Sequence, residues 1–316
     1  MTRPVLALDL GGTQLRTAVV LVDGTLLGRL ASATPRQPAD ELVATSAAQL
    51  RATLTAASDA GAGGFGPIAL AISAPGPLDP FGGTFIDPPN LDPTLRGFPF
   101  AAALGEAIGL PAAMERDTQI AALAEGRFGA ARGLTDYVYL TVSTGIGGGV
   151  VSDGRLLRGV DGLANELGHL PIDLDGPTCG CGARGHLEGI ASGIGIARAL
   201  GVDDARQVAA REEAGDADAN RVMAYARRAF AAACVSIVDL YNPQRIVVGG
   251  GVAIGQGDRL LEPARQAIKE FAFRRQAERV EVVPAQLGDD VGLVGGLSLV
   301  ALAGLGDDMD LHNEST

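Results

Sequence analysis

Potential metal ligands and hydrogen-bonding side chains are concentrated in one short part of the chain, Asp161–Gly189. This segment contains two of the three histidines and two of the three cysteines of the sequence, namely His169, Cys179, Cys181 and His186. Glu166 lies three residues before His169, and Glu188 lies two residues after His186. Imidazole and thiolate groups bind zinc, whereas carboxylates accept hydrogen bonds from hydroxyl groups. The segment therefore predicts a metal-braced site for a polar small molecule; the alternative is a charged loop in solvent.

A closed, structural zinc site requires four nitrogen or sulfur ligands. The four predicted ligands supply two of each kind, so we expect them to hold Zn²⁺. Such a site would fix the loop that presents Glu166 and Glu188, and the second ring nitrogen of His169 would be available to a substrate. The Cys-x-Cys spacing is too tight for an easy disulfide. In the alternative, His186 is only a surface residue, and the zinc is lost or three-coordinate.

Three glycine-rich turns, each after an apolar strand, are further candidates for a functional role. They lie at Asp9–Thr13, Ser143–Gly149 and Gly249–Gly251. Glycine lets backbone N–H groups approach an anion, so such turns can cradle phosphates. In the first turn the expected donors are Gly11, Gly12 and Thr13, and Asp9 is placed to hold Mg²⁺. The alternative is a hairpin that merely needs glycine, and none of the three turns contains the Gly-Lys-Ser/Thr of a Walker loop.

The composition argues against nucleic-acid and membrane partners. The chain carries 25 Lys and Arg against 37 Asp and Glu, a net charge of −12, which disfavours phosphate backbones and anionic membrane surfaces. No apolar run approaches the ~20 residues that span a bilayer, and we find no signal peptide. Three cysteines do not make a secreted disulfide framework, and Cys234 fits a buried helix face. We therefore expect a cytoplasmic protein.

Apolar strands and helical segments alternate along the chain, which indicates an α/β fold. A strand, a glycine turn, a strand, an Asp-Gly pair and a third strand occur twice, at Val5–Ala31 and Tyr137–Leu157. This repetition predicts two similar domains that face each other across a cleft. We place an N-terminal α/β domain at 1–117, with the helix at 291–305 packed back onto it. A C-terminal α/β domain with the zinc loop follows at 118–290, and a flexible tail at 306–316.

Three local features of this α/β chain affect the site. We expect a turn at Gly145–Gly149 and a single helix across Ile190–Leu200. The segment Leu78–Gly97, rich in Gly, Pro, Asn and Asp, is longer than a usual connection, so we expect a functional loop there.

Three blocks of sequence resemble the ROK family of sugar kinases and sugar-responsive repressors. They are DLGGT at Asp9–Thr13, STGIGGGVVSDGRLLRG at Ser143–Gly159 and ELGHLPIDLDGPTCGCGARGHLE at Glu166–Glu188. The resemblance extends from Val5 to Leu302. It implies the actin/hexokinase-like (ribonuclease H-like) fold, in which two duplicated domains flank a central cleft, and it implies a homodimer.

The resemblance implies that ATP phosphorylates a hexose hydroxyl. It places the phosphates of ATP against Asp9–Thr13 and against a second group of residues, Thr144, Gly145 and Gly147. Adenosine would lie near Gly249, Gly250 and Gly251. The sugar is assigned to Gly76, Asn90, Arg116, Asp117, Glu166, His169 and Glu188. Glucose is the leading substrate; fructose, mannose, N-acetylmannosamine and N-acetylglucosamine remain open, as does polyphosphate in place of ATP.

The resemblance makes Asp117 the catalytic base, in the turn Glu115–Gln119. A helix is predicted to begin here, and its dipole favours the carboxylate. A modest base is enough, because phosphoryl transfer passes through a loose transition state. The alternative is a plain helix N-cap. Arg116 and Gln119 replace asparagines of the family turn, and Arg116 most simply reaches the sugar or a loop carbonyl. His186 replaces a cysteine of the zinc block.

Two other functions compete with the kinase. Repressors of this kind carry a helix-turn-helix ahead of the kinase core; only eight residues precede Asp9, so we expect none here, and the acidic charge disfavours DNA. The other is a non-catalytic sugar-binding protein in which Arg116 has disabled the site. Turnover of ATP with a panel of hexoses distinguishes these possibilities.

Overall fold

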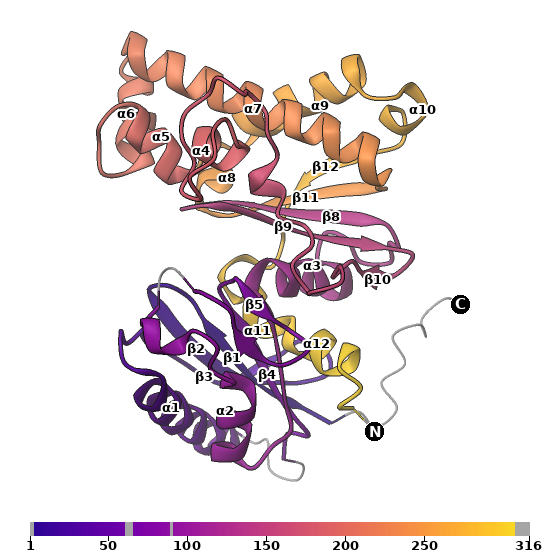
Figure 1. Cartoon of the computed structure of the whole chain (residues 1–316). Helices are drawn as coiled ribbons and strands as arrows, with labels where there is room; N and C mark the ends of the chain where they lie inside the picture. Colours follow the sequence, from indigo (N-terminus) through magenta and orange to yellow (C-terminus); the bar gives the residue numbers. More distant parts are fainter. Residues whose placement is uncertain (1–2, 61–65, 89–90, 307–316) are drawn as a thin grey trace. The chain divides into compact units, whose positions relative to one another are not determined.

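The computed structural model describes residues 3–60, 66–88 and 91–306, so Asn90 and most of the predicted tail lie outside the described residues. Contacts divide the chain into two compact units (Figure 1). The second unit comprises Gly129–Leu157 and Asn165–Gly288. The first comprises the remaining three segments, Met1–Phe128, Arg158–Ala164 and Asp289–Thr316. This division differs from the predicted boundary after Asp117, because the following helix and the segment Arg158–Ala164 pack with the first unit.

The first unit is built on a five-stranded sheet in the order β3-β2-β1-β4-β7. Its strands are β1 (Val5–Leu10), β2 (Gln14–Val20), β3 (Leu26–Ala33), β4 (Leu70–Ala74) and β7 (Ala112–Arg116). β2 is antiparallel to β1 and β3, whereas β4 is parallel to β1 and β7. β1 and β4 are buried along their whole length, as apolar strands covered on both faces must be.

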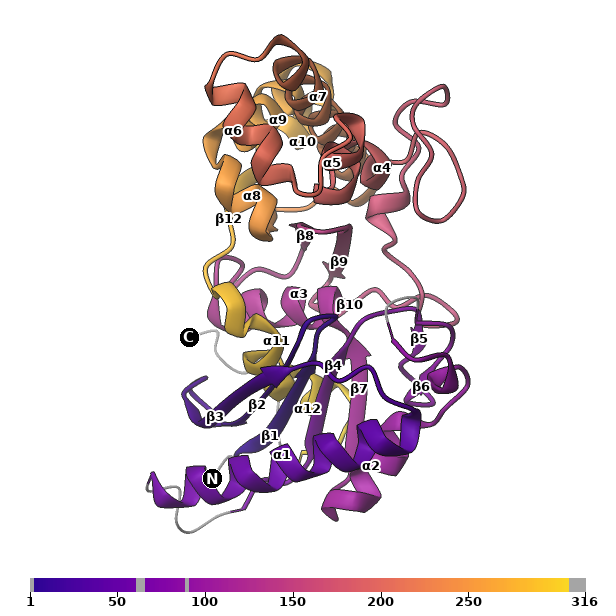
Figure 2. The same cartoon turned by 90° about the vertical axis from the view of Figure 1, so that its left-hand side faces the viewer.

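Helices cover both faces of this sheet (Figure 2). Alternate side chains of a strand point to opposite faces. Accordingly, Leu6 and Leu8 pack with α1 (Ala39–Asp59) and α2 (Phe100–Ile108), whereas Val5 and Ala7 pack on the other face. That other face is covered by α3 (Asp117–Phe128), α11 (Val291–Val294) and α12 (Gly296–Leu302). The loop between β4 and α2 contains β5 (Leu78–Asp79), β6 (Thr84–Phe85) and the 3₁₀ helix η1 (Pro93–Leu95).

The second unit repeats the same sheet. Its strand order is β10-β9-β8-β11-β12. The strands are β8 (Tyr137–Val142), β9 (Ile146–Ser152), β10 (Arg155–Leu156), β11 (Arg245–Gly249) and β12 (Glu281–Pro284). Two antiparallel pairings are followed by two parallel ones, as in the first unit. The predicted repetition of one β-meander is therefore confirmed.

Helices of the second unit pack around the long helix α7 (Ala217–Tyr241), whose Phe230, Cys234 and Ile237 are fully buried. Cys234 is thus a core residue, as predicted. The other helices are η2 (Leu167–His169), α4 (Leu187–Ala191), α5 (Gly193–Ala199), α6 (Ala205–Glu213), α8 (Gly251–Gln256), α9 (Asp258–Phe271) and α10 (Arg274–Ala277). The 3₁₀ helix η3 (Gly288–Asp290) leads back into the first unit.

Two local predictions are wrong. Gly145–Gly149 is not one turn, because β9 begins at Ile146 and pairs with β8. A side-chain carbon at Gly148 would lie 2.6 Å from Leu167 Cδ1 and 2.9 Å from the backbone carbonyl oxygen of Tyr139. This strand therefore needs glycine at position 148 to make room for Leu167. The helix predicted at Ile190–Leu200 is divided at Ser192, whose hydroxyl caps α5 by accepting a hydrogen bond from the Gly195 N–H.

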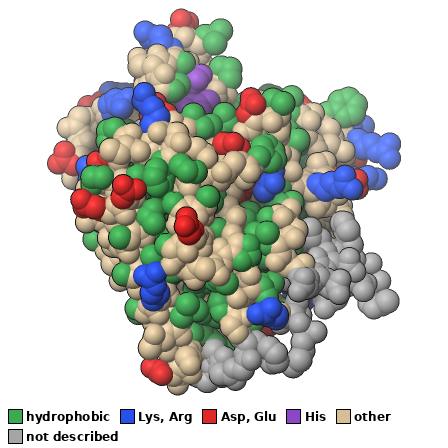
Figure 3. Space-filling model, turned by 60° about the horizontal axis from the view of Figure 1, so that its bottom comes forward, with side chains coloured by type: hydrophobic (Ala, Val, Ile, Leu, Met, Phe, Trp, Pro, Cys, Tyr) green, Lys and Arg blue, Asp and Glu red, His purple; other side chains and the backbone are tan. Residues whose placement is uncertain are grey.

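Both signs of charge occur at the surface. On the face drawn in Figure 3, lysine and arginine side chains are interspersed with aspartates and glutamates. None of the helices in the described part of the chain combines the length and the apolar character that crossing a bilayer requires.

Candidate functional site

Asp117 is exposed at the first residue of α3, directly after the buried end of strand β7. Its carboxylate accepts a hydrogen bond of 2.7 Å from the Thr118 N–H. The partial positive charge of the helix N-terminus stabilises an ionised carboxylate at this position. A solvent-accessible anion therefore stands where the sheet ends, which suits both the predicted base and a plain helix cap.

Arg116 and Gln119, which lie close to Asp117 in the chain, are buried. Arg116 is 4% exposed, and its guanidinium donates a hydrogen bond to the Ala164 carbonyl. Of the two partners expected for Arg116, the structure provides the loop carbonyl. Gly76, predicted on the sugar side, packs against this side chain, because a carbon added at Gly76 would lie 2.9 Å from Arg116 Cδ. Gln119 also donates to the Ala164 carbonyl, at 3.2 Å.

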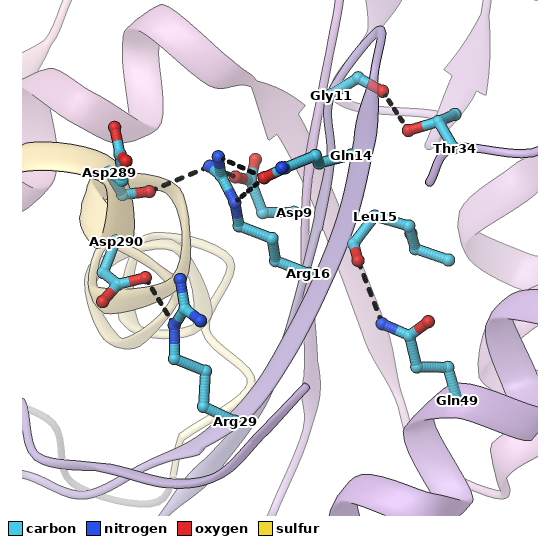
Figure 4. A network of polar contacts seen from close by, with 10 residues as sticks. All are labelled: Asp9, Gly11, Gln14, Leu15, Arg16, Arg29, Thr34, Gln49, Asp289 and Asp290. Atoms are coloured by element: carbon cyan, nitrogen blue, oxygen red, sulfur yellow. Dashed lines mark hydrogen bonds and ion pairs between the residues drawn. The ribbon is translucent and has the colours of Figure 1, made fainter. Parts of the chain in front are cut away.

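The first glycine turn joins β1 to β2. The Gly11 N–H donates to the Gln14 carbonyl at 2.9 Å, which closes the turn. The Thr34 hydroxyl donates to the Gly11 carbonyl at 2.6 Å (Figure 4). Gly12 and Thr13 are exposed at the tip. The turn is thus fixed at its base and presents its tip to solvent, as a phosphate-binding loop requires.

Asp9 lies below this turn and is almost completely buried. Arg16 reaches it across the hairpin, with Nη1 at 3.4 Å from Asp9 Oδ2 and 3.0 Å from the Asp289 carbonyl oxygen (Figure 4). Burial raises the pKa of the Asp9 carboxyl above its ordinary value, and the positive charge of Arg16 opposes this shift. The negative charge of Asp290 adds to the increase.

We expect activity to fall on the acid side at a higher pH than an exposed aspartate would give. A carboxylate that holds Mg²⁺ must be ionised, and burial makes Asp9 take up its proton at higher pH. Arg16→Met removes the opposing cation, so the acid limb of kcat/KM for MgATP should move to still higher pH. Arg274→Met is the control, because Arg274 is exposed and pairs with Glu278 rather than with Asp9 or Asp290. Superimposable profiles for wild type and Arg16→Met would contradict this role for Asp9.

The second glycine turn, between β8 and β9, is held by Glu188. Its Oε2 accepts a hydrogen bond of 3.0 Å from the Ile146 N–H. Gly145 lies against the same carboxylate, because a side-chain carbon there would be 2.6 Å from Glu188 Oε2. Gly147 pairs with Thr141 inside the sheet. Glu188, predicted to contact sugar, thus also supports a turn predicted to face phosphate.

A cavity of about 720 Å³ opens in the second unit beside this turn. It brings together Thr144 from the second turn and Gly251 from the third. Gly250 has φ of 93° and would clash with the Val142 carbonyl if it carried a side chain. The volume is within the range of small-molecule sites. Further wall residues come from α5, α6, α7, α8 and the loop before α6, including Ile194, Asp204, Arg206, Glu213, Met223 and Gln256. These wall residues were not predicted, because they belong to ordinary-looking helices.

The four predicted zinc ligands meet in space. One donor atom from each of His169, Cys179, Cys181 and His186 lies within 4.8 Å of the others. The two Nδ1 atoms are 3.3 Å apart, and the sulfur–nitrogen distances are 3.7 Å for the first Cys–His pair and 3.4 Å for the second. A tetrahedral zinc with ordinary bond lengths separates its ligands by roughly 3.3–3.8 Å. The cluster therefore fits zinc, and histidine side chains are visible at the surface in Figure 3.

This cluster is connected to the other predicted sugar contacts. His169 directs Nδ1 into the cluster, and its Nε2 lies 3.9 Å from Glu166 Oε2. Glu188 Oε1 lies 3.5 Å from the Cys179 sulfur. Burial raises the pKa of the Cys179 thiol, and the nearby Glu188 charge adds to the increase. A metal cation among these groups would offset both effects and favour the thiolate.

Two sheets of the same strand order and pairing pattern, each with a glycine turn between its first two strands along the chain, define a duplicated two-unit α/β protein. The chain belongs to the ROK family, whose model matches residues 5–302. A glucokinase of Halalkalibacterium halodurans is 32% identical and aligns with 92% of this chain and 93% of its own. An N-acetylmannosamine kinase of Escherichia coli is 36% identical, with 93% and 97% covered.

Solved structures agree with the fold. A ROK hexokinase from Thermus thermophilus matches with a TM-score of 0.84 and 35% identity over 95% of this chain and 99% of that one. A ROK family glucokinase from Streptomyces griseus, in complex with glucose and AMPPNP, matches with a TM-score of 0.75 and 29% identity, covering 94% and 98%. The predicted family and the actin/hexokinase-like fold class are confirmed.

Proposed function

We propose that this protein transfers the γ-phosphoryl group of ATP to a hexose hydroxyl, with glucose the leading acceptor. The observation that carries the proposal is the exposed carboxylate of Asp117 at the N-terminus of α3. Two glycine turns of the kind that binds phosphate accompany it. The relatives named glucokinase and the glucose and AMPPNP complex support the same reaction.

In the proposed mechanism, Asp117 accepts a hydrogen bond from the attacking hydroxyl and takes its proton late in the transfer. Phosphoryl transfer needs positioning and charge neutralisation more than strong base catalysis. Backbone N–H groups of Gly12 and Thr13 supply donors to the phosphates, in a turn that the Gly11 N–H closes by donating to the Gln14 carbonyl. Thr144 and Gly145 supply further donors. Asp9 would hold Mg²⁺, which neutralises charge on the phosphates when bound. Adenosine would occupy the cavity at Gly251.

Zinc is proposed as a structural ion held by His169, Cys179, Cys181 and His186. The distances among the donor atoms of these four side chains support this assignment. All four positions come from the protein, which is typical of structural zinc sites. The ion would fix the loop from which Glu166, His169 and Glu188 contact sugar hydroxyls. Gly76 and Asn90 remain predictions on the sugar side.

A second sugar class is favoured by one relative. The N-acetylmannosamine kinase is as similar to this chain as the glucokinase, so an N-acetylhexosamine is the alternative acceptor. Arg116, whose guanidinium donates a hydrogen bond to the Ala164 carbonyl, also remains a proposed sugar contact. Polyphosphate as donor and a homodimer also remain proposals.

A coupled assay of ADP release with a hexose panel tests the function. Glucose, mannose, fructose, N-acetylmannosamine and N-acetylglucosamine are compared at saturating MgATP, with polyphosphate as a second donor. We expect saturable turnover with at least one of them, and highest kcat/KM with glucose. Sugar binding by calorimetry without any turnover would instead select a non-catalytic sugar-binding protein.

A further inference from the structure

The segment Arg158–Ala164 docks as a closed loop, which we call the docking loop, against the residues around Asp117. It belongs to the first unit, although the chain on both sides of it belongs to the second. The Ala164 N–H donates to the Arg158 carbonyl at 3.0 Å. Just outside, the Asn165 side chain donates to the Leu157 carbonyl at 2.6 Å. The docking loop is therefore closed at its base by hydrogen bonds.

One end of the docking loop binds the strand that leads to Asp117. Arg158 Nε donates to Glu115 Oε2 at 2.9 Å. The other oxygen of Glu115 accepts the Arg116 N–H at 2.9 Å. Glu115 is completely buried and Arg158 is 18% exposed, so the pair is shielded from water. A buried carboxylate needs such a partner, because burial alone raises its pKa, and Arg158 counteracts that increase.

The other end of the docking loop binds the start of α3. The Ala164 carbonyl accepts hydrogen bonds from the Arg116 guanidinium and from Gln119 Nε2. The loop thus contacts positions 115, 116 and 119, which surround Asp117 on both sides, whereas Asp117 itself stays exposed. Arg158 also lies over the Phe81 ring, 5.6 Å from its centroid, which limits its own freedom.

We propose that Arg158 is a positioning residue for the proposed reaction: through Glu115, it holds the turn that aims the Asp117 carboxylate. The inference rests on the proposed function, because it needs Asp117 to be the base. Glu115 transmits the effect, since one carboxylate binds both the Arg158 side chain and the backbone N–H immediately before Asp117. Misplacing a reacting group by about 1 Å can cost roughly 100-fold in rate, so a small shift of this turn should be visible in kcat.

The first test is steady-state kinetics of Arg158→Met, with the best sugar of the panel. We expect kcat to fall roughly 10- to 100-fold, with KM for ATP unchanged because the glycine turns are not altered. Arg158→Lys should restore most of the loss, since it returns the positive charge to Glu115. The control is Arg274→Met, which removes an arginine that is 93% exposed in a surface pair with Glu278 and should leave kcat unaltered.

A second variant separates positioning from stability. In Glu115→Gln/Arg158→Met neither member of this ion pair leaves an unpaired charge buried, so thermal stability should return toward that of wild type, while the turn still lacks its ion pair. Positioning predicts that kcat stays low in this double variant. Recovery of kcat together with stability would overturn the inference, and the double variant decides the matter if Arg158→Met does not fold.

Different results would contradict the positioning role of Arg158 and the proposed kinase function. Turnover by wild type that is lost in Asp117→Asn but kept in Arg158→Met removes the inference and leaves the proposed function standing. Absence of turnover in wild type with every sugar and donor removes both.

Discussion

Replacing Asp117 with asparagine is expected to lower kcat by roughly 10²- to 10⁴-fold, the range that general base catalysis supplies. The amide keeps the size of the side chain but cannot accept the proton of the attacking hydroxyl. Binding of ATP should be unaffected, because the glycine turns are remote in sequence and hold their own contacts. The measurement is coupled ADP release at saturating sugar, with calorimetry for ATP affinity.

The control for this variant is another helix-capping aspartate. Asp216 caps α7 by accepting hydrogen bonds from the N–H groups of Asp218 and Ala219. Asparagine caps helices about as well as aspartate, so Asp216→Asn should keep full activity. If Asp117 were only a cap, the two variants would behave alike, and a fully active Asp117→Asn would remove the proposed mechanism.

Loss of the metal is expected to have the second largest effect. Cys179→Ser replaces a thiolate ligand with a hydroxyl, so the variant should contain much less than one zinc per chain. Zinc then no longer fixes the loop that presents Glu166, His169 and Glu188. The value of kcat/KM for sugar should fall by at least roughly 10- to 100-fold, the loss typical of groups that merely orient metal ligands. Metal analysis and kinetics on the same sample check both parts.

The matched control is Cys234→Ala, which alters the buried cysteine of α7. It should retain zinc and sugar affinity, with only a modest loss of stability. Wild-type protein that is purified without chelators and contains no zinc would contradict the metal assignment. So would a Cys179→Ser variant with unchanged kcat/KM for sugar.

Much of the fold could be predicted because its signals are local. The apolar run of β1 and the Asp-Gly turns identified both meanders, and the sheet order repeats accordingly. The meeting of His169, Cys179, Cys181 and His186 could also be predicted, since these residue types are rare in this chain and the two histidines are 17 positions apart. Residue types and their spacing in the sequence were sufficient to predict this cluster.

Contacts between distant positions could not be predicted in this way. Glu115 and Arg158 are 43 positions apart, and Arg16 and Asp289 are 273 apart. Neither pair produces a periodic or compositional signal. The glycines at the start of β9 were misassigned for a related reason: Gly148 is required by the close approach of Leu167, which is a tertiary contact, whereas glycine clusters usually indicate turns.

The most direct test of the central claim is a crystal structure of the protein with its best sugar and a non-hydrolysable ATP analogue. We predict one sugar hydroxyl oxygen within about 2.6–3.2 Å of an Asp117 carboxylate oxygen, with that hydroxyl directed at the terminal phosphorus. A bound sugar whose hydroxyls all contact other groups, while Asp117 accepts a hydrogen bond from the Thr118 N–H and none from the sugar, would contradict the proposed role of Asp117 as the base.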